Sequence, residues 1–346
     1  MKSLRLVGPR KFQWFEEEKP EPGAGEVRIA VQAVGICGSD IHAYVHCRTG
    51  DHVMVEPMVL GHEFSGLIDA IGPGVEGLAV GDLVAVDPAI ACGHCEYCLE
   101  GNPNFCVNLR FAGSVSNDGA LREYLIQPAT MVYRLGKAFT SSDAAMLEPL
   151  GVALHSIRLA KVKPADWVAI HGCGPIGLCL IQMARLSGAG KIIAFEPLEN
   201  RRQMALKMGA DHVFSPADGE AAQCIRSLGR SYVDIALEAA GDAQAVWEAV
   251  EIAKPGGEVV LVGIPKEDQT AFRASAARQK GLTIKIVRRM KHTYPQCIAL
   301  VEKGLVDLRS FVTHHLPFEQ AGDGYRMVEE RSQGVIKAVI HIGEEV

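Results

Sequence analysis

Four cysteines lie close together in the segment CGHCEYCLEGNPNFC. They are Cys92, Cys95, Cys98 and Cys106, with the spacing C-x2-C-x2-C-x7-C. Four thiolates carried by one short loop suit tetrahedral Zn²⁺, and such sites are structural because no position is left for a substrate. An iron–sulfur cluster also takes four cysteines, but its usual spacings differ. The spacing therefore predicts a structural zinc site.

A glycine-rich turn follows the apolar segment WVAIH. Gly172, Gly174 and Gly177 form the pattern G-x-G-x-x-G, with Pro175 and Ile176 between the last two glycines. Between a strand and a helix, these glycines permit a tight turn, close approach of the backbone to a pyrophosphate and close helix packing. The helix N-terminus supplies N–H donors to the phosphates. The turn therefore predicts a dinucleotide site.

An acidic residue stands where a dinucleotide site requires one. Glu196 ends the segment KIIAFE, about 20 positions beyond the glycines, where a carboxylate accepts hydrogen bonds from the adenosine ribose. It would repel the 2′-phosphate of NADP, so the sequence favours NAD. Arg201 and Arg202 leave NADP open, because either guanidinium could bind that phosphate. Arg201 is therefore counted with Glu196 among the candidate cofactor-binding residues.

A third set of residues is scattered along the chain. It comprises Cys37 in GICGSDIH, His62 and Glu63 in LGHEFSG, and Glu148 in MLEPLGVALH. Sulfur, imidazole and carboxylate ligands together suit a catalytic zinc ion, which keeps one position open for water or substrate. Read singly, each of these residues has a structural explanation, and spacing alone does not bring them together.

In order and separation, these motifs resemble the zinc-dependent medium-chain dehydrogenase/reductase family, and within it the sorbitol-type polyol dehydrogenases. The resemblance covers almost the whole chain and rests on GICGSDIH, VLGHEFSG, the four-cysteine loop, EPLGVALH and GCGPIG. It implies that Cys37 and His62 bind catalytic zinc. It also implies that Glu63 and Glu148 stand at the metal, directly or through water.

The resemblance assigns roles to three further side chains. Ser39 is expected to hydrogen-bond the reacting oxygen, and His42 to help conduct the released proton outward. Arg289 occupies the place of an arginine that faces the substrate in sorbitol-type enzymes, where a tyrosine follows it. Here Met290 replaces that tyrosine, which removes one hydroxyl group. We therefore expect sorbitol to be a mediocre substrate and a shorter, cyclic or deoxy polyol to be preferred.

The implied activity is hydride transfer from a secondary hydroxyl of a small polyol-like substrate to NAD, which gives a ketone. L-Threonine 3-dehydrogenase and a general zinc alcohol dehydrogenase remain alternatives, as does a protein that binds zinc and NAD without turnover. The family also implies a homodimer or homotetramer. The apolar segment GEVVLVGI is expected at a sheet edge, where it would be covered by a second subunit.

Two patterns of secondary structure must position these residues. Short β-branched segments at 27–33, 66–71 and 83–86, separated by Gly and Pro, are typical of an antiparallel β region. From about residue 153, strands and helices alternate, which predicts a doubly wound parallel sheet. Later pieces are short, with a helix near 294–303 and a terminal strand, VIKAVIHI. We expect an α/β protein with a GroES-like catalytic domain, residues 1–152 and 287–346, and a Rossmann NAD-binding domain, residues 153–286.

Composition limits the possible partners. The 35 Lys and Arg residues against 41 Asp and Glu give a formal charge of -6, so no basic field is available to hold a nucleic acid. No apolar run reaches the roughly 18 residues of a membrane span, and the N-terminus lacks a secretory signal. We therefore expect a cytoplasmic protein with no nucleic-acid or membrane partner. Its ten cysteines then indicate metal ligation and reduced thiols rather than disulfides.

Overall fold

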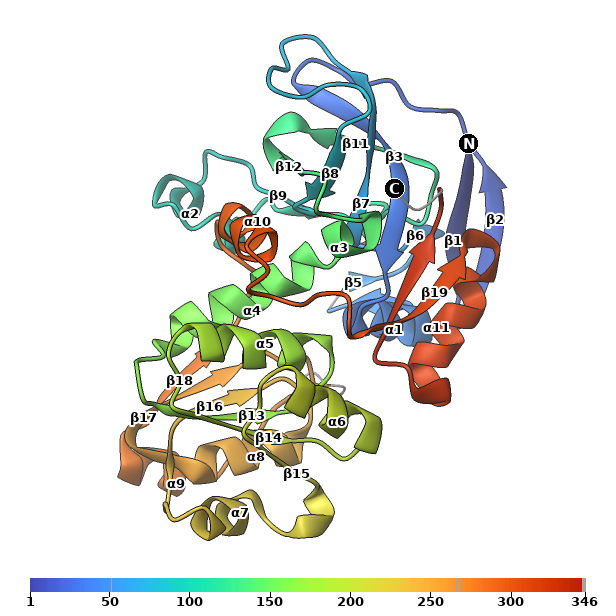
Figure 1. Ribbon diagram of the computed structural model, residues 1–346. Helices are drawn as coiled ribbons and strands as arrows, with labels where there is room; N and C mark the ends of the chain where they lie inside the picture. The colour runs from blue at the N-terminus through green and yellow to red at the C-terminus, as the bar shows by residue number, and fades with distance from the viewer. Residues whose placement is uncertain (51, 266, 268, 344–346) are drawn as a thin grey trace. The chain divides into compact units, whose positions relative to one another are not determined.

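The chain forms two compact units. The computed structural model describes residues 1–50, 52–265, 267 and 269–343. The first unit comprises Met1–Glu148, Tyr294–Gly304 and Leu308–Val346, and the second comprises Pro149–Thr293 and Leu305–Asp307. Both ends of the chain thus belong to the first unit (Figure 1). Within the described residues, none of the helices is long and apolar enough to cross a bilayer.

The first unit is built on a seven-stranded sheet. Its order is β12-β8-β7-β3-β20-β19, and β11 also pairs with β3. All its pairs are antiparallel except β19 with β20. The strands are β3 (Glu26–Gly35), β7 (Glu63–Ile71), β8 (Leu83–Val86), β11 (Tyr124–Pro128), β12 (Val132–Arg134), β19 (Val312–Pro317) and β20 (Lys337–His341). The three strands predicted in the first third of the chain, at 27–33, 66–71 and 83–86, are confirmed.

Smaller elements surround this sheet. A second sheet has the order β2-β1-β6, and two further two-stranded sheets pair β4 with β5 and β9 with β10. These strands are β1 (Lys2–Gly8), β2 (Lys11–Glu16), β4 (Arg48–Thr49), β5 (His52–Val53), β6 (Met58–Val59), β9 (Ala89–Ile90) and β10 (Arg110–Phe111). The helices of the unit are α1 (Gly38–His46), α2 (Glu96–Leu99), α3 (Ser141–Ala145), α10 (Tyr294–Glu302) and α11 (Ala321–Glu330).

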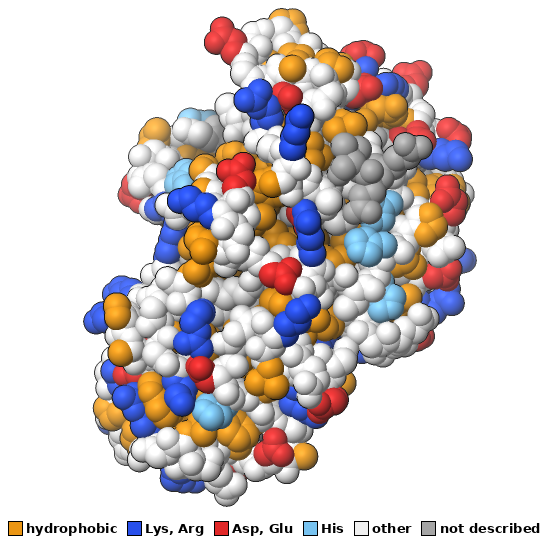
Figure 2. All heavy atoms as spheres, in the orientation of Figure 1, with side chains coloured by type: hydrophobic (Ala, Val, Ile, Leu, Met, Phe, Trp, Pro, Cys, Tyr) orange, Lys and Arg blue, Asp and Glu red, His pale blue; other side chains and the backbone are white. Residues whose placement is uncertain are grey.

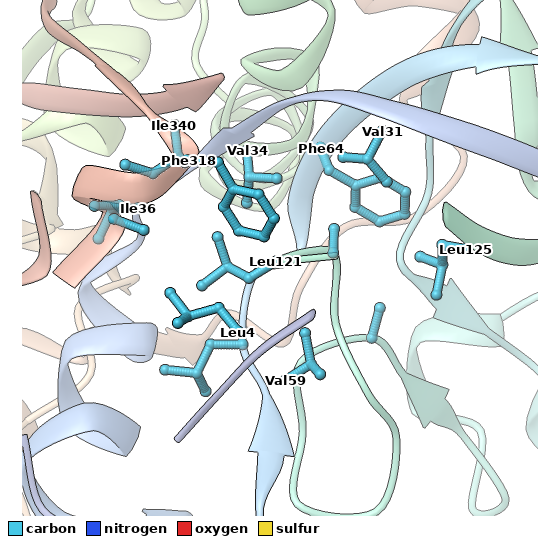
Figure 3. Close-up of a cluster of buried hydrophobic side chains, with 14 of the residues drawn as sticks. Leu4, Val31, Val34, Ile36, Val59, Phe64, Leu121, Leu125, Phe318 and Ile340 are labelled. Atoms are coloured by element: carbon cyan, nitrogen blue, oxygen red, sulfur yellow. The ribbon is translucent and has the colours of Figure 1, made fainter. Parts of the chain in front are cut away.

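The apolar core of the first unit joins the two ends of the chain. Leu4 from β1 and Val34 from β3 belong to the same buried cluster as Phe318 and Ile340 near the C-terminus (Figure 3). Burying each such side chain contributes roughly 1.5–3 kcal/mol. The C-terminal segment is therefore an integral part of the fold that positions the N-terminal site residues.

The second unit is a parallel sheet with helices on both faces. The strand order is β15-β14-β13-β16-β17-β18. Its strands are β13 (Trp167–His171), β14 (Lys191–Phe195), β15 (His212–Phe214), β16 (Val233–Glu238), β17 (Ala253–Leu261) and β18 (Thr283–Ile286). Helices α5 (Pro175–Leu186) and α6 (Glu199–Lys207) cover one face, and α7 (Ala221–Ser227), α8 (Ala243–Ile252) and α9 (Ala274–Lys280) the other (Figure 1). This confirms the predicted doubly wound parallel sheet.

The strand order reverses beside β13. The chain moves outward from β13 to β14 and β15, then returns to place β16 on the other side of β13. In open parallel sheets, ligands bind at such a switch point, outside the carboxyl ends of the strands. The glycine-rich turn at 172–177 follows the carboxyl end of β13, so the topology places it where a dinucleotide would bind.

The prediction that the segment GEVVLVGI lies at a sheet edge is wrong. The segment GEVVLVGI falls largely within β17, which pairs with β16 on one side and with β18 on the other. The edge on this side of the sheet is β18, a four-residue strand, TIKI, whose Ile286 is 74% exposed. So short a strand, followed directly by a loop, is hard to separate from irregular chain by its pattern alone.

Candidate metal centres and nucleotide site

The four cysteines of the CGHCEYC loop converge. Their sulfur atoms all lie within 4.8 Å of one another, with Cys95 Sγ 3.5 Å and Cys92 Sγ 4.0 Å from Cys98 Sγ. A tetrahedron with Zn–S bonds of about 2.3 Å has S–S edges of about 3.8 Å. The sulfur separations therefore match four-coordinate zinc.

Backbone N–H groups stabilise negative charge on these sulfurs. Cys95 N donates to Cys92 Sγ at 3.4 Å, and Cys92 N donates to Cys106 Sγ at 3.3 Å. Hydrogen bonding by the backbone of His94, opposed by desolvation, lowers the pKa of Cys92 to about 6. All ten cysteines of the chain are free thiols. The donor set thus suits a metal that binds thiolates.

Cys37, His62 and Glu63 form a second cluster of possible ligands. One ligand atom from each lies within 4.8 Å of the others. The pairing of β3 with β7 explains this, because Gly35 opposes Glu63 in the register, and Cys37 follows β3 as the N-cap of α1. His62 and Glu63 are buried while Cys37 is partly exposed. A mixed S/N/O set that is open on one side fits a catalytic zinc site.

Asp40 orients two members of this cluster. Its Oδ1 lies 3.1 Å from His62 Nδ1, and its Oδ2 accepts a hydrogen bond from Cys37 N at 3.0 Å. Burial lowers the pKa of His62, but the charges of Asp40 and Cys37 outweigh it, so the pKa lies well above its usual value. With Nδ1 held by Asp40, Nε2 is left to face a metal. Sequence reasoning missed Asp40, although an acid three residues after a helix N-cap is a recognisable pattern.

A buried lysine neutralises Glu63. Lys337 Nζ contacts the Glu63 carboxylate and donates to the Ile36 carbonyl at 2.9 Å, and both charged side chains are only 2% exposed. Gly35 makes room for the pair, since an added Cβ there would overlap the Glu63 carboxylate. Lys337 lies 274 positions from Glu63, and no local signal in the sequence identifies it.

Glu148 stands beside the cluster rather than among its converging ligand atoms. It occupies the first turn of α4 (Leu147–Ala160) and is 6% exposed. Burial raises its pKa to about 7, while the charge of His62 lowers it and that of Glu63 raises it. A cation bound at the cluster would favour its ionised form.

Ser39 and His42 both lie on α1, the helix that Cys37 caps. Ser39 stands in the first turn and His42 one turn later, and both are partly buried. The His42 ring lies 6.1 Å from that of His46. Cys37, Ser39 and His42 thus come from one helix and its N-cap.

The glycine-rich turn has the geometry that its pattern predicts. Gly172 has φ +90°, and an added Cβ would lie 2.9 Å from Ala240 N. At Gly177, a Cβ would overlap the Gly172 carbonyl oxygen. Gly174 is the N-cap of α5, and Pro175 is its first residue, followed by Ile176. The turn therefore leaves a helix N-terminus free of side chains, which fits a dinucleotide pyrophosphate.

Glu196 is directed back toward this turn. Its Oε2 accepts from Cys173 N at 2.7 Å and its Oε1 from Leu198 N at 3.0 Å, and the residue is 3% exposed. Arg201 Nη1 lies 3.7 Å from the position that a Cβ at Gly174 would take. The carboxylate and one guanidinium thus flank the expected adenosine end of a dinucleotide.

Arg202, by contrast, is engaged within the fold. Its guanidinium donates to the carbonyl oxygens of Glu196 and Pro197 at 2.9 and 2.6 Å. It also pairs with Glu199.

Arg289 lies in the segment between β18 and α10. It is partly exposed and has φ +57°, which is unusual for a residue with a side chain. Met290, beside it, is 6% exposed. Its sulfur lies against Gly151 of α4, where an added Cβ would come within 2.5 Å of it.

Two family models match the chain. The Alcohol dehydrogenase GroES-like domain matches residues 23–137, and the Zinc-binding dehydrogenase model matches residues 175–303. A sorbitol dehydrogenase of Bacillus subtilis is 34% identical over 99% of this chain and 97% of its own length. A probable D-xylulose reductase A of Arthroderma otae is 38% identical over 94% of each chain.

A solved structure has the same fold throughout. An alcohol dehydrogenase of E. coli CFT073, complexed with the cofactor NADH, superposes with a TM-score of 0.91 at 31% identity and covers 99% of both chains.

The chain belongs to the zinc-containing medium-chain alcohol dehydrogenase family. It combines a GroES-like domain with a Rossmann domain and is an NAD(P)-dependent zinc alcohol or polyol dehydrogenase. The four-cysteine cluster is its structural zinc site, and the cluster of Cys37, His62 and Glu63 is its catalytic zinc site. The zinc and nucleotide predictions are thereby confirmed at the level of the cofactors.

Proposed function

We propose that this protein oxidises a secondary hydroxyl group of a small polyol to a ketone, with NAD as the hydride acceptor. The observation that carries the proposal is the convergence of Cys37, His62 and Glu63 in a buried cluster that is open at Cys37. The names of the relatives support a polyol, since the Bacillus subtilis protein is a sorbitol dehydrogenase and the Arthroderma otae protein a probable xylulose reductase.

The residues around the cluster have distinct proposed roles. Cys37, His62 and a carboxylate from Glu63 or Glu148 would hold zinc, whose positive charge makes an alcohol proton more acidic. Asp40 fixes the ring of His62 through the contact at 3.1 Å. This leaves the imidazole in one orientation and so maintains the geometry of the site.

The proton of the substrate hydroxyl needs an acceptor. We propose that Ser39 Oγ hydrogen-bonds the reacting oxygen and that His42, one turn further along α1, transfers the proton toward solvent. The shared helix supports this pairing, because Cys37 caps it and both residues lie within its first two turns.

We propose that the second unit is the NAD-binding domain and that it prefers NAD to NADP. NAD supplies the hydride acceptor itself, while the protein orients it. The carboxylate of Glu196 is held beside the glycine-rich turn by two backbone N–H groups. A 2′-phosphate placed there would meet like charge, and Arg202 is engaged with backbone oxygens instead. Arg201, near Gly174, would then face the cofactor phosphates rather than a 2′-phosphate.

We further propose that Arg289 binds substrate hydroxyls. Met290, directed inward, provides no hydroxyl group of its own. One substrate hydroxyl near residue 290 would then have no hydrogen-bond partner. A polyol that lacks this hydroxyl, or a cyclic polyol, should therefore be preferred over sorbitol.

The test is NADH formation by the zinc-loaded enzyme over a panel of substrates. Sorbitol, xylitol, L-iditol, arabinitol, galactitol and the inositols form the polyol arm, and L-threonine and simple alcohols form the other arms. The proposal is supported if the substrate with the highest kcat/KM in the whole panel is a polyol. Efficient oxidation of L-threonine with no polyol activity would refute it.

We also propose a symmetric homo-oligomer that pairs through β18. This edge strand carries Ile286, which is 74% exposed, and exposed apolar edges are usually covered. Ile286→Lys should weaken the association, and light scattering should then give a lower mass than for the wild type. A wild-type mass near 37.2 kDa at micromolar concentration would refute the proposal.

A further inference from the structure

A glycine in the middle of α4 lies against the segment that follows β18. An added Cβ at Gly151 would come within 2.5 Å of the Met290 sulfur and 2.7 Å of Thr293 Oγ1. Met290 is 6% and Thr293 1% exposed. A second contact anchors the same segment to α4, because Arg158 Nη1 donates to the Lys291 carbonyl at 3.2 Å. The Met290 side chain therefore fills a notch that exists only because residue 151 lacks a side chain.

The segment held in this way has an unusual backbone. Residues 287–293 form neither helix nor strand, and both Arg289 and His292 are left-handed, with φ of +57° and +49°. Such conformations persist in residues with side chains when the surrounding packing fixes them. Met290 and Lys291 lie between the two, so the place of Met290 in the notch and the bond from Arg158 to the Lys291 carbonyl together hold this backbone.

We infer that Met290, seated against Gly151, is a positioning residue that governs which polyol the enzyme selects. It acts through Arg289, whose backbone it fixes, and the inference rests on the proposed function, in which Arg289 binds substrate hydroxyls. Methionine has three rotatable bonds and takes the shape of its surroundings. Its position therefore depends on the notch, and a change at residue 151 moves Arg289 without altering any group that contacts the substrate.

A displaced Arg289 should change substrate binding rather than the hydride-transfer step. Displacement of Arg289 should raise KM and alter the ratio of kcat/KM for xylitol to kcat/KM for sorbitol, with a smaller effect on kcat. The zinc ligands lie in the other unit, so the zinc content should stay at the wild-type value.

A double-mutant cycle tests the inference. Gly151→Ala and Met290→Ala should each change KM or the xylitol-to-sorbitol ratio by about 10-fold. Because both disturb the same contact, the double variant should change them by about 10-fold as well, rather than by about 100-fold. Met290→Leu, which keeps most of the side-chain volume, should remain within about twofold of the wild type.

A matched control substitutes a helical glycine that has space. At Gly322 in α11, an added Cβ would meet only Phe12, at 3.9 Å, so Gly322→Ala should leave KM and the ratio unchanged. If Gly151→Ala does not fold, the test rests on KM and the xylitol-to-sorbitol ratio of Met290→Ala and Met290→Leu.

Two results would overturn the inference while leaving the proposed function intact. One is a fall in Tm with KM and the ratio unmoved, which would show that the contact serves packing only. The other is additive shifts of about 100-fold, which would show that the two residues act independently. A wild-type enzyme that oxidises no polyol would overturn the proposed function, and this inference with it.

Discussion

Removing the buried ammonium group of Lys337 should destabilise the first unit severely. Lys337→Met keeps most of the side-chain length but leaves the Glu63 carboxylate without its ammonium partner, and both groups are 2% exposed in the wild type. The substitution also removes the donor to the Ile36 carbonyl. Removing one partner of a buried ion pair costs about 3–5 kcal/mol. That is a large fraction of the roughly 5–15 kcal/mol that stabilises a domain.

The assay is urea or thermal unfolding followed by circular dichroism, with zinc present at a fixed concentration. Lys254→Met is the matched control, since Lys254 pairs with Asp234 at 2.5 Å but is 47% exposed. Exposed ion pairs contribute about 0–1 kcal/mol, so this variant should unfold almost as the wild type does. If Lys337→Met is no less stable than Lys254→Met, the reasoning about the buried pair is wrong.

Three further predictions concern other parts of the chain. Cys98→Ser should lower Tm and release one zinc equivalent while the nucleotide unit still binds NADH, because a structural site contributes folding free energy; metal analysis and calorimetry check this. Glu196→Ala should narrow the preference for NAD over NADP by at least about 10-fold, measured as a ratio of kcat/KM values, and equal use of both cofactors by the unmodified enzyme would contradict it. Burial alone would raise the pKa of Glu17, but hydrogen bonds from Ser3 and Arg5 and the charge of Arg122 lower it from 4.5 to about 2. Its contribution to stability has an upper limit of about 3.5 kcal/mol, at about 1.4 kcal/mol per pKa unit, and solvent screening reduces it. This contribution should be present above pH 4.5 and be lost as the pH falls toward 2. Glu17→Gln should flatten the dependence of unfolding free energy on pH in that window, and an unchanged slope would contradict the assignment.

The surface agrees with the charge balance of the sequence. On the face shown in Figure 2, Lys and Arg side chains are interspersed with Asp and Glu. This face therefore carries charges of both signs.

The sequence could predict those parts of the site whose residues lie close together in the chain. The Cys92–Cys106 loop and the turn at Gly172 each lie within one short segment, so their spacing carries the geometry. The alternation of strands and helices likewise predicted β13 to β17 with α5, α6 and α8, because each has a clear period, whereas the short helix α7 was missed.

Contacts between distant segments could not be predicted in this way. The pairing of Lys337 with Glu63 depends on how β20 and β7 are placed around β3, which no local pattern encodes. The contact between Gly151 and Met290 was also unpredictable. Nothing in the sequence of the helix indicates that Met290 packs against this glycine. The elements α11, β18 and β19 were missed because short or mixed segments give weak periodicity.

Zinc content measured together with polyol oxidation tests the central claim most directly. The account predicts two zinc ions per chain in the wild type, one at each cluster, and NADH formation with at least one polyol. In Cys37→Ser it predicts one zinc ion per chain, a folded protein and no polyol oxidation. A wild type that holds one zinc ion per chain, or a Cys37→Ser enzyme that still oxidises the polyol, would contradict it.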